Sequence, residues 1–335
     1  MAKSTATSFL GRARRALSLV APARSEALWR LERRLAKRLG RRIDKLERRL
    51  TKRLKRVEGR LERRLTKRLK RVESRLGRAM ESKDSKDSAT AVGRVDYPGA
   101  AIELKARTVR ECFRLRATEK EPWTVDWLDG SVHPGECVYD VGANVGAYSL
   151  IAAMGGARAQ VVAFEPGFAS FATLCENIAH NRVDDRVTPL PLALSDATEL
   201  ATLTYSALGS GEAMHRLGPR DISGAGVFRQ PLLTYRLDDV VERFGLRPPD
   251  HLKVDVDGNE VAALRGAERT LASATLRSVM VEVEAEDAKA IEALLRKAGL
   301  ECTVQTERRV KDAKRVDHWY ELWVRPEGPG LRADR

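Results

Sequence analysis

A glycine-containing loop stands in the middle of the chain, in the segment VYDVGANVGAYSL (138–150), between an apolar run and a helical pattern. Gly142 and Gly146 are four residues apart, and Asn144 lies between them. A loop that binds the pyrophosphate of a dinucleotide needs a third glycine, so that backbone amides can approach the phosphates. Asn144 tolerates the left-handed backbone of a tight turn and adds a side-chain amide that can form hydrogen bonds. The spacing therefore favours a ligand without a diphosphate.

A glutamate follows the next apolar run, AQVVAFEP (159–166), about 20 residues beyond the glycine loop. An acidic side chain at this point of a nucleotide-binding sheet accepts hydrogen bonds from the ribose hydroxyls of an adenosine. A glutamate at a strand end can also be no more than a solvated cap. The glycine loop at the matching distance upstream favours the ribose-binding role for Glu165.

Acidic residues also follow a later apolar run, in LKVDVDGNE (252–260). Asp255 and Asp257 lie where an expected strand enters a turn, so both are candidate general bases. An aspartate near a glycine can instead serve only to shape the turn. His215, in GSGEAMHRLG, is a further candidate base on an expected loop. A divalent metal held by Asp255, Asp257 and Glu260 is an alternative, but nothing fixes a third ligand, and we predict no metal site.

The elements that must position these residues alternate along the chain. Strands are expected at 136–142, 159–166, 187–194, 251–257 and 277–284, with helices at 168–181 and 259–273 among them. A helix at 286–300 leads into two last strands at 301–307 and 318–325, and shorter β-rich runs are expected at 101–106 and 108–117. Strands that alternate with helices pair in parallel, so we expect an α/β fold with a doubly wound sheet and a ligand beyond the strand C-termini. Glu282 and Glu284 share one face of the fifth strand and are candidates for substrate contact.

The positive charge of the chain is concentrated near its N-terminus. The formal net charge is +14, and residues 31–75 alone hold 21 lysines and arginines against six acidic residues. The rest of the chain is therefore nearly neutral, which argues against a cleft that follows the phosphates of a nucleic acid.

Three 15-residue repeats, which begin at Leu31, Leu46 and Leu61, make up this basic segment. Their apolar residues recur every three or four positions, as on one face of a helix. A 15-residue repeat gives about 3.75 residues per turn, which predicts a right-handed supercoil. Like charges four residues apart destabilise the isolated helix. We expect self-association into a homo-oligomer; a helix that lies on an anionic membrane surface and a solvated spacer helix are the alternatives.

Composition divides the chain into five parts. We expect an N-terminal tail at 1–26, the basic amphipathic helix at 27–80, a flexible linker at 81–93, a globular domain at 94–326 and a C-terminal tail at 327–335. The N-terminus resembles a signal peptide only weakly, because arginines interrupt its short apolar run. The four cysteines are widely spaced, and no apolar run is long enough to span a membrane. We therefore expect a cytoplasmic protein, with contact to a membrane surface as an alternative.

Five motifs together resemble a known family. In chain order they are YDVGANVGAYSL, VVAFEP, LPLALSDA, YRLDDV and LKVDVDGNEVAALRGA, and the resemblance runs from about residue 121 to 284. They are similar to the FkbM family of S-adenosylmethionine-dependent methyltransferases. The resemblance implies the class I methyltransferase fold: a Rossmann-like, mostly parallel sheet with an antiparallel last strand, here preceded by the long basic helix. Family members usually carry a glutamate where this chain has Asp257, which shortens the reach of that carboxylate.

The resemblance also implies roles for individual residues in binding S-adenosylmethionine. The methionine end would be held by Asp140, Gly142, Asn144 and Gly146, the ribose by Glu165, and the adenine by the backbone around Leu192 and Ala193. The implied activity is O-methylation of a hydroxyl on a sugar, a glycan or a secondary metabolite. Because the methyl group arrives activated, the protein must position the acceptor and remove its proton, for which Asp255 and Asp257 come first.

Two other classes of function remain open at this stage. A nucleic-acid or protein methyltransferase could dock its substrate through the basic helix. The sequence RPPD (247–250) lacks the aromatic residue expected in amino-group methyltransferases of bases, and no Pro-Cys dipeptide is present for C5-cytosine methylation. Nucleic acid is therefore an unlikely partner on sequence grounds. A scaffold that binds but does not catalyse is the third class, although the intact loop and Glu165 favour an enzyme.

Overall fold

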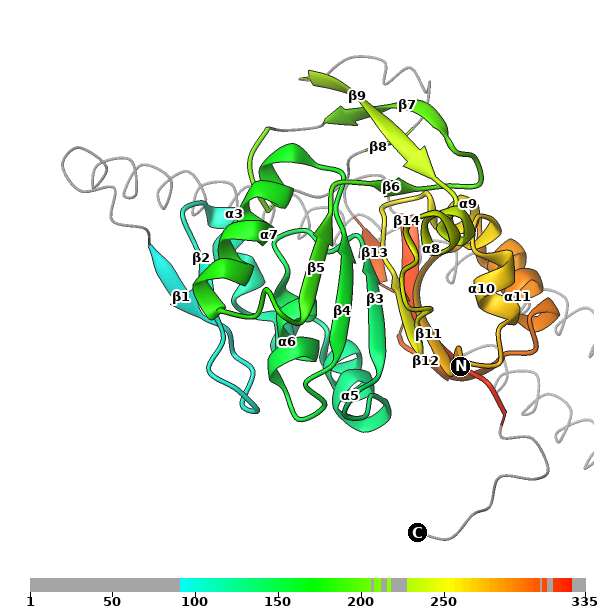
Figure 1. Cartoon of the computed structure of the whole chain (residues 1–335), viewed down its shortest axis with the longest axis horizontal. Helices are drawn as coiled ribbons and strands as arrows, with labels where there is room; N and C mark the ends of the chain where they lie inside the picture. The colour runs from blue at the N-terminus through cyan, green and yellow to red at the C-terminus, as the bar shows by residue number, and fades with distance from the viewer. Residues whose placement is uncertain are drawn as a thin grey trace, which may run out of the picture. The chain divides into compact units, whose positions relative to one another are not determined.

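The computed structural model describes residues 91–205, 208–211, 216–217, 228–307, 309–311 and 316–326. The basic repeat and His215 lie outside these residues. Within them, the chain forms a large mixed sheet covered by helices, a smaller sheet beside it and an N-terminal hairpin (Figure 1).

The large sheet has the strand order β12-β14-β11-β10-β3-β4-β5, and β13 pairs with β14. The strands are β3 (Cys137–Val141), β4 (Gln160–Phe164), β5 (Val187–Leu190), β10 (His251–Val254), β11 (Ser278–Glu284), β12 (Glu301–Gln305), β13 (Arg309–Lys311) and β14 (Val316–Val324). The five from β5 to β11 are parallel, and β14 runs antiparallel to β11 and β12. This confirms the predicted doubly wound α/β fold with an antiparallel last strand.

Helices cover both faces of the large sheet, and each face has its own hydrophobic cluster. One layer consists of α5 (Pro122–Ser131), α6 (Ala147–Met154) and α7 (Phe168–Asn181); the other consists of α8 (Leu237–Phe244), α9 (Glu260–Arg265), α10 (Glu268–Ala272) and α11 (Ala288–Lys297) (Figure 1). The central strands are buried on both faces, which explains their nearly continuous apolar sequences.

The connections of the sheet create a crevice between β3 and β10. From β3 the chain adds β4 and then β5 on one side, and it later returns to add β10 and β11 on the other side. The loops that leave β3 and β10 therefore diverge above the C-terminal ends of two neighbouring parallel strands. Ligands of doubly wound sheets bind at this kind of switch point.

The N-terminal part of the described chain differs from the prediction in two ways. A strand, β1 (Val92–Arg94), begins inside the expected linker 81–93 and pairs with β2 (Glu103–Lys105). The run 108–117, expected to be β-rich, instead contains α3 (Val109–Arg114), and α4 (Ala117–Lys120) begins at its last residue. The reason is a capping box, in which the Thr108 hydroxyl accepts from the Glu111 amide and the Glu111 carboxylate accepts from the Thr108 amide.

Two other expected elements are interrupted. The strand expected at 187–194 ends at Leu190 and resumes as β6 (Ala193–Leu194) in the smaller sheet, because Pro191 lacks the amide that a strand ladder needs. The helix expected at 259–273 is broken into α9 and α10 near Gly266. A Cβ atom at Gly266 would lie 2.0 Å from the carbonyl oxygen of Ser195, so the chain turns where only glycine fits.

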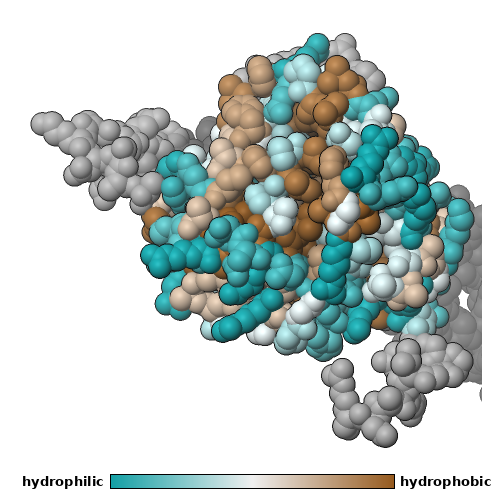
Figure 2. All heavy atoms as spheres, viewed as in Figure 1, coloured by the Kyte–Doolittle hydropathy of each residue, from teal (hydrophilic) through white to brown (hydrophobic). Residues whose placement is uncertain are grey.

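The smaller sheet has the order β6-β9-β7-β8, where β7 is Glu199–Tyr205, β8 is Arg216–Leu217 and β9 is Phe228–Tyr235. It lies above the large sheet in Figure 1, and Figure 2 shows apolar residues gathered on this part of the surface. Leu200 and Leu233 are paired across β7 and β9 and are exposed. The sequence analysis predicted no strand between 199 and 235 and expected a loop around His215.

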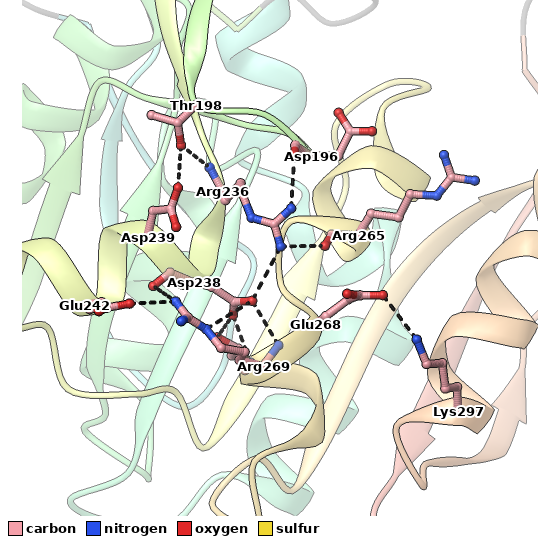
Figure 3. A network of polar contacts seen from close by, with 11 residues as sticks. Asp196, Thr198, Arg236, Asp238, Asp239, Glu242, Arg265, Glu268, Arg269 and Lys297 are labelled. Atoms are coloured by element: carbon pink, nitrogen blue, oxygen red, sulfur yellow. Dashed lines mark hydrogen bonds and ion pairs between the residues drawn. The ribbon is translucent and has the colours of Figure 1, made fainter.

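A buried aspartate joins the two helices α8 and α10 (Figure 3). Asp238 accepts hydrogen bonds from the backbone amides of Arg269 and Thr270, each at 2.9 Å, and from the Thr270 hydroxyl at 2.8 Å. Ala267, the residue at the N-cap of α10, has no side-chain acceptor. Asp238 therefore caps this helix from a distant segment, and Arg236 and Arg269 lie within 4 Å of its carboxylate.

Replacing Asp238 by alanine should lower the free energy of unfolding by about 2–4 kcal/mol, because two amides and a hydroxyl lose a charged acceptor. Urea titration of the full chain measures the change. Glu242→Ala is the control: Glu242 binds the same Arg269 but is 69% exposed, so its loss should cost less than about 0.5 kcal/mol. Equal losses for the two variants would contradict the capping role.

Candidate functional site

The glycine loop after β3 has the left-handed backbone that its sequence predicted. Gly142 and Gly146 have φ angles of +87° and +88°, and Asn144 has φ of +51°. A Cβ atom at Gly142 would lie 1.9 Å from the carbonyl oxygen of Asp255, so the loop after β3 touches the loop after β10. The Asn144 side chain accepts a hydrogen bond from the amide of Val145 at 3.0 Å and stabilises the turn locally.

Glu165 connects this loop with the loop after β4. One carboxylate oxygen accepts from the Asn144 amide at 2.8 Å, and the other accepts from the Gly167 amide at 2.7 Å. Burial raises the pKa of Glu165 to about 7, although these two amides and Arg114 act in the opposite direction. A carboxylate has about four lone-pair sites, so each oxygen can accept a further hydrogen bond from a ligand hydroxyl.

Two cavities lie on either side of the glycine loop and share Gly142. The first, which we call the apolar cavity, is lined by Phe164, Pro166, Leu192 and Ala193 together with residues from β7, β8 and the loop after β10. Its lining is mostly apolar, as suits a planar aromatic ring. Leu192 and Ala193, which the resemblance assigns to the adenine, therefore line one cavity. Phe164 and Pro166, the two neighbours of Glu165 in the sequence, line the same cavity.

The second, the polar cavity, is lined by Asn144, Tyr148, Arg114, Lys253 and Asp255, among others. Its walls come from the glycine loop, α6, α3 and β10. Three basic side chains line it, those of Arg114, Lys120 and Lys253, and one carboxylate, that of Asp255. The cavity therefore offers donors and positive charge around a single acidic group.

A buried lysine lies at the base of the polar cavity. Its side chain is 3% exposed, and its ammonium lies 3.6 Å from the Asp140 carboxylate and 3.3 Å from that of Asp255. These carboxylates hold the pKa of Lys253 above its usual value, although burial acts to lower it. The ammonium also lies 5.3 Å from the centre of the Tyr148 ring. Lys253 therefore remains protonated and ties β3 to the end of β10.

Asp255 is oriented by two donors. Its Oδ2 atom accepts from Lys253 Nζ at 3.3 Å and from the Tyr320 hydroxyl at 3.2 Å. Tyr320 comes from β14, and burial raises its pKa well above the usual value, so its hydroxyl stays protonated. Asp255 thus lines the cavity, and the two hydrogen bonds to Oδ2 hold its carboxylate in one orientation.

Sequence comparison adds a family to this geometry. Residues 140–302 match the family described as the methyltransferase FkbM domain. The matched segment begins at Asp140, near the end of β3, and includes the glycine loop, Glu165 and the loop after β10. It covers the lining of the apolar cavity, whereas Arg114 and Lys120 of the polar cavity precede it.

Relatives of the FkbM domain carry methyltransferase names. The hexuronic acid methyltransferase AglP of Haloferax volcanii is 28% identical over 218 residues, which cover 65% of this chain and 85% of that protein. The 31-O-demethyl-FK506 methyltransferase FkbM of Streptomyces tacrolimicus is 30% identical over 161 residues, 41% of this chain and 61% of that protein. The crystal structure of a methyltransferase FkbM from Methylobacillus flagellatus KT aligns with 17% identity and a TM-score of 0.41, over 64% of this chain and 52% of that chain. The family and the relatives' names identify the chain as a methyltransferase.

Several residues proposed from the sequence are not part of the lining of either cavity, namely Asp140, Gly146, Glu165, Asp257 and Glu260. The Asp140 carboxylate is buried between the Ser149 hydroxyl, at 2.6 Å, and Lys253. Asp257 lies in the turn after β10 with φ of +56°, which for an aspartate is a strained conformation. Glu260 folds back to accept from the amides of its own turn, so it shapes the turn. His215 lies outside the described residues.

Sequence reasoning missed several residues of the site, namely Arg114, Tyr148, Lys253 and Tyr320. Lys253 had a signal, since a lysine within an apolar strand must have partners when it is buried. Arg114 and Tyr320 come from segments far away in the chain, and only the fold brings them to the cavity. Glu282, a suggested substrate contact, is buried 3.8 Å from His318, and Glu284 stands opposite His318 on β14.

In the described ranges, no group of three or more histidine, cysteine, aspartate or glutamate side chains has the arrangement of a metal site. No helix of the described part of the chain is long and apolar enough to cross a membrane.

Proposed function

We propose that the chain uses S-adenosylmethionine to methylate a hydroxyl of a sugar or of a secondary metabolite. The observation that carries the proposal is the pair of cavities that meet at Gly142, one apolar and one polar, with Glu165 beside the loop between them. Their chemistry matches the three parts of this cofactor: an adenine ring, a ribose diol and a charged amino acid. The names of two relatives, which specify a hexuronic acid and a 31-O-demethyl compound, support the acceptor class.

The residues at hand fit this cofactor. The apolar cavity would take the adenine against Leu192 and Ala193. Glu165 would accept from the ribose hydroxyls through the lone pairs that the two amides leave unused. Gly142 lines both cavities, and only glycine allows the close approach of its loop to the Asp255 backbone. When bound, the cofactor would supply a methyl group that is already activated on a sulfonium.

Asp255 is the proposed general base. It is the one carboxylate among the side chains that line the polar cavity in the described part of the chain. Lys253 and Tyr148 cannot serve at neutral pH, because both have pKa values above their usual range and stay protonated. The acceptor hydroxyl would pass its proton to the Asp255 carboxylate as its oxygen bonds to the methyl carbon. Tyr320 and Lys253 would hold that carboxylate in place.

The proposal is tested with the purified full chain, S-adenosylmethionine and glycosides of glucuronic and galacturonic acid. We expect mass spectrometry to show one added methyl group per acceptor and an equal amount of S-adenosylhomocysteine. Asp255→Asn should bind the cofactor normally and lower turnover by about 10²- to 10⁴-fold. If the wild-type chain binds neither S-adenosylmethionine nor S-adenosylhomocysteine, the proposal fails. If it binds them but methylates none of these sugars, uronic acids are not the acceptor.

The basic repeat remains a proposed self-association segment. Its leucine stripe would be buried between copies of the chain, which relieves the cost of exposing it. Sedimentation of the full chain with Leu50→Glu and Leu65→Glu together should give a smaller mass than the wild type. Equal masses for the variant and the wild type would contradict self-association. Binding to an anionic membrane surface would then be the alternative, and flotation with phosphatidylserine vesicles would detect it.

A further inference from the structure

The cations of the polar cavity differ in how far their charge is already neutralised. Lys253 lies between two carboxylates, and Lys120 forms an ion pair with Glu121. Arg114 is different. Among the described residues its guanidinium has a single polar contact, in which Nη2 donates to the carbonyl oxygen of Gly211 at 3.2 Å.

Arg114 also lies on the cofactor side of the cavity. It lines the cavity together with the glycine-loop residues Ala143, Asn144 and Val145. Its charge reaches Glu165, because it lowers the pKa of that carboxyl. Arg114 is the last residue of α3, and its contact with Gly211 fixes the side chain over the loop. A guanidinium has five N–H donors in a planar fork, so most of its donors are available to a ligand.

A carboxylate matches this fork, and it is the anionic group that the proposed cofactor carries. A guanidinium and a carboxylate form two parallel, charge-assisted hydrogen bonds, which a lysine cannot reproduce. Two carboxylates could reach the polar cavity if the proposed function holds: that of the cofactor's amino acid end, and that of a uronic acid acceptor. Arg114 lines this cavity together with the glycine-loop residues 143–145, which the proposed function assigns to the cofactor, so we assign its fork to the cofactor's carboxylate.

We infer that Arg114 binds the carboxylate of the methionine end of the cofactor, a role that rests on the proposed function and that the motifs of the chain do not reveal. Arg114 thereby links α3, which precedes the matched family segment, to the cofactor site. The Asp140 carboxylate, expected to contact the methionine end, is instead committed to Ser149 and Lys253.

Calorimetry with two ligands tests the inference on the full chain. S-adenosylhomocysteine carries the carboxylate, whereas 5′-methylthioadenosine lacks the whole amino acid. Arg114→Gln should raise the Kd of S-adenosylhomocysteine about 10- to 100-fold, the size expected for charged hydrogen bonds, and change that of methylthioadenosine less than twofold. Arg114→Lys should recover part of the loss. Arg116→Gln is the matched control, since Arg116 is exposed, pairs with Glu119 and should leave both constants unchanged.

The outcomes separate this inference from the proposed function. If the wild-type chain binds neither ligand, the proposed function itself fails. If Arg114→Gln weakens both ligands equally, Arg114 supports the fold of the site and does not bind a carboxylate. The third outcome is that Arg114→Gln binds S-adenosylhomocysteine as the wild type does but, when saturated with that ligand, no longer binds glucuronate. Arg114 would then bind the carboxylate of the acceptor. Either of the last two results overturns the inference, while binding of the cofactor by the wild-type chain still supports the proposed function.

Discussion

Replacing Glu165 by alanine is expected to weaken binding of S-adenosylhomocysteine to the full chain by about 100-fold. The variant loses a charged acceptor that both ribose hydroxyls would use, and each such hydrogen bond contributes about 1.5–3 kcal/mol. Calorimetry gives the two dissociation constants. Glu176→Ala is the control, because Glu176 lies on α7 and pairs with Lys105 and Arg107 at the surface, away from both cavities. Unchanged affinity in Glu165→Ala would remove the ribose-binding role.

The same residue predicts a pH dependence. Burial raises the pKa of Glu165 to about 7, and ribose hydroxyls donate to its ionised form. Protons therefore compete with the ligand below that pH. The Kd of S-adenosylhomocysteine should rise as the pH falls from about 8 to 6, with a slope that approaches tenfold per pH unit well below the pKa. Glu165→Gln cannot ionise and should bind with an affinity that is weaker and nearly independent of pH; an unaltered pH profile in this variant would contradict the assignment.

The second large effect concerns the buried lysine. Lys253→Met should lower the free energy of unfolding by about 3–5 kcal/mol, because Asp140 remains buried without its positive partner. For a domain of this size the melting temperature should fall by about 10 °C. Differential scanning calorimetry of the full chain measures it. Lys289→Met, on the exposed side of α11, is the control and should shift the melting temperature by no more than about 2 °C.

A second substitution distinguishes charge from packing in the Lys253 variant. Adding Asp140→Asn to Lys253→Met removes the uncompensated carboxylate, so part of the lost stability should return. If the double variant is no more stable than Lys253→Met, the loss comes from the cavity left by the side chain, and the ion pair is not what stabilises this end of β3 and β10.

The sheet and the turn of the glycine loop were predictable because short-range patterns specify them. The apolar runs around 137–141 and 160–164 are long enough to be strands buried on both faces. The left-handed turn at Asn144 follows from residue types alone, and the structure confirms it. Where one residue overrides a pattern, the prediction was wrong: Thr108 caps a helix in a β-rich run, and Pro191 ends a strand early.

The polar cavity was not predictable, because tertiary structure assembles it. Asp255 was found from its place after a strand, but its donors Lys253 and Tyr320 come from two different strands. Arg114 reaches the cavity from a helix that the sequence analysis expected to be β structure. The smaller sheet, with Leu203 and Leu217 on the apolar cavity, depends on pairings between distant segments that no local pattern specifies.

The most direct test of the central claim is hydrogen exchange of the full chain with and without S-adenosylhomocysteine. If the cofactor spans the two cavities, amides at 141–146, 164–168 and 192–194 should exchange more slowly when the ligand is bound, while α11 on the opposite face of the sheet should not change. If the ligand binds and those three segments exchange at unaltered rates, the site lies elsewhere and the account is wrong.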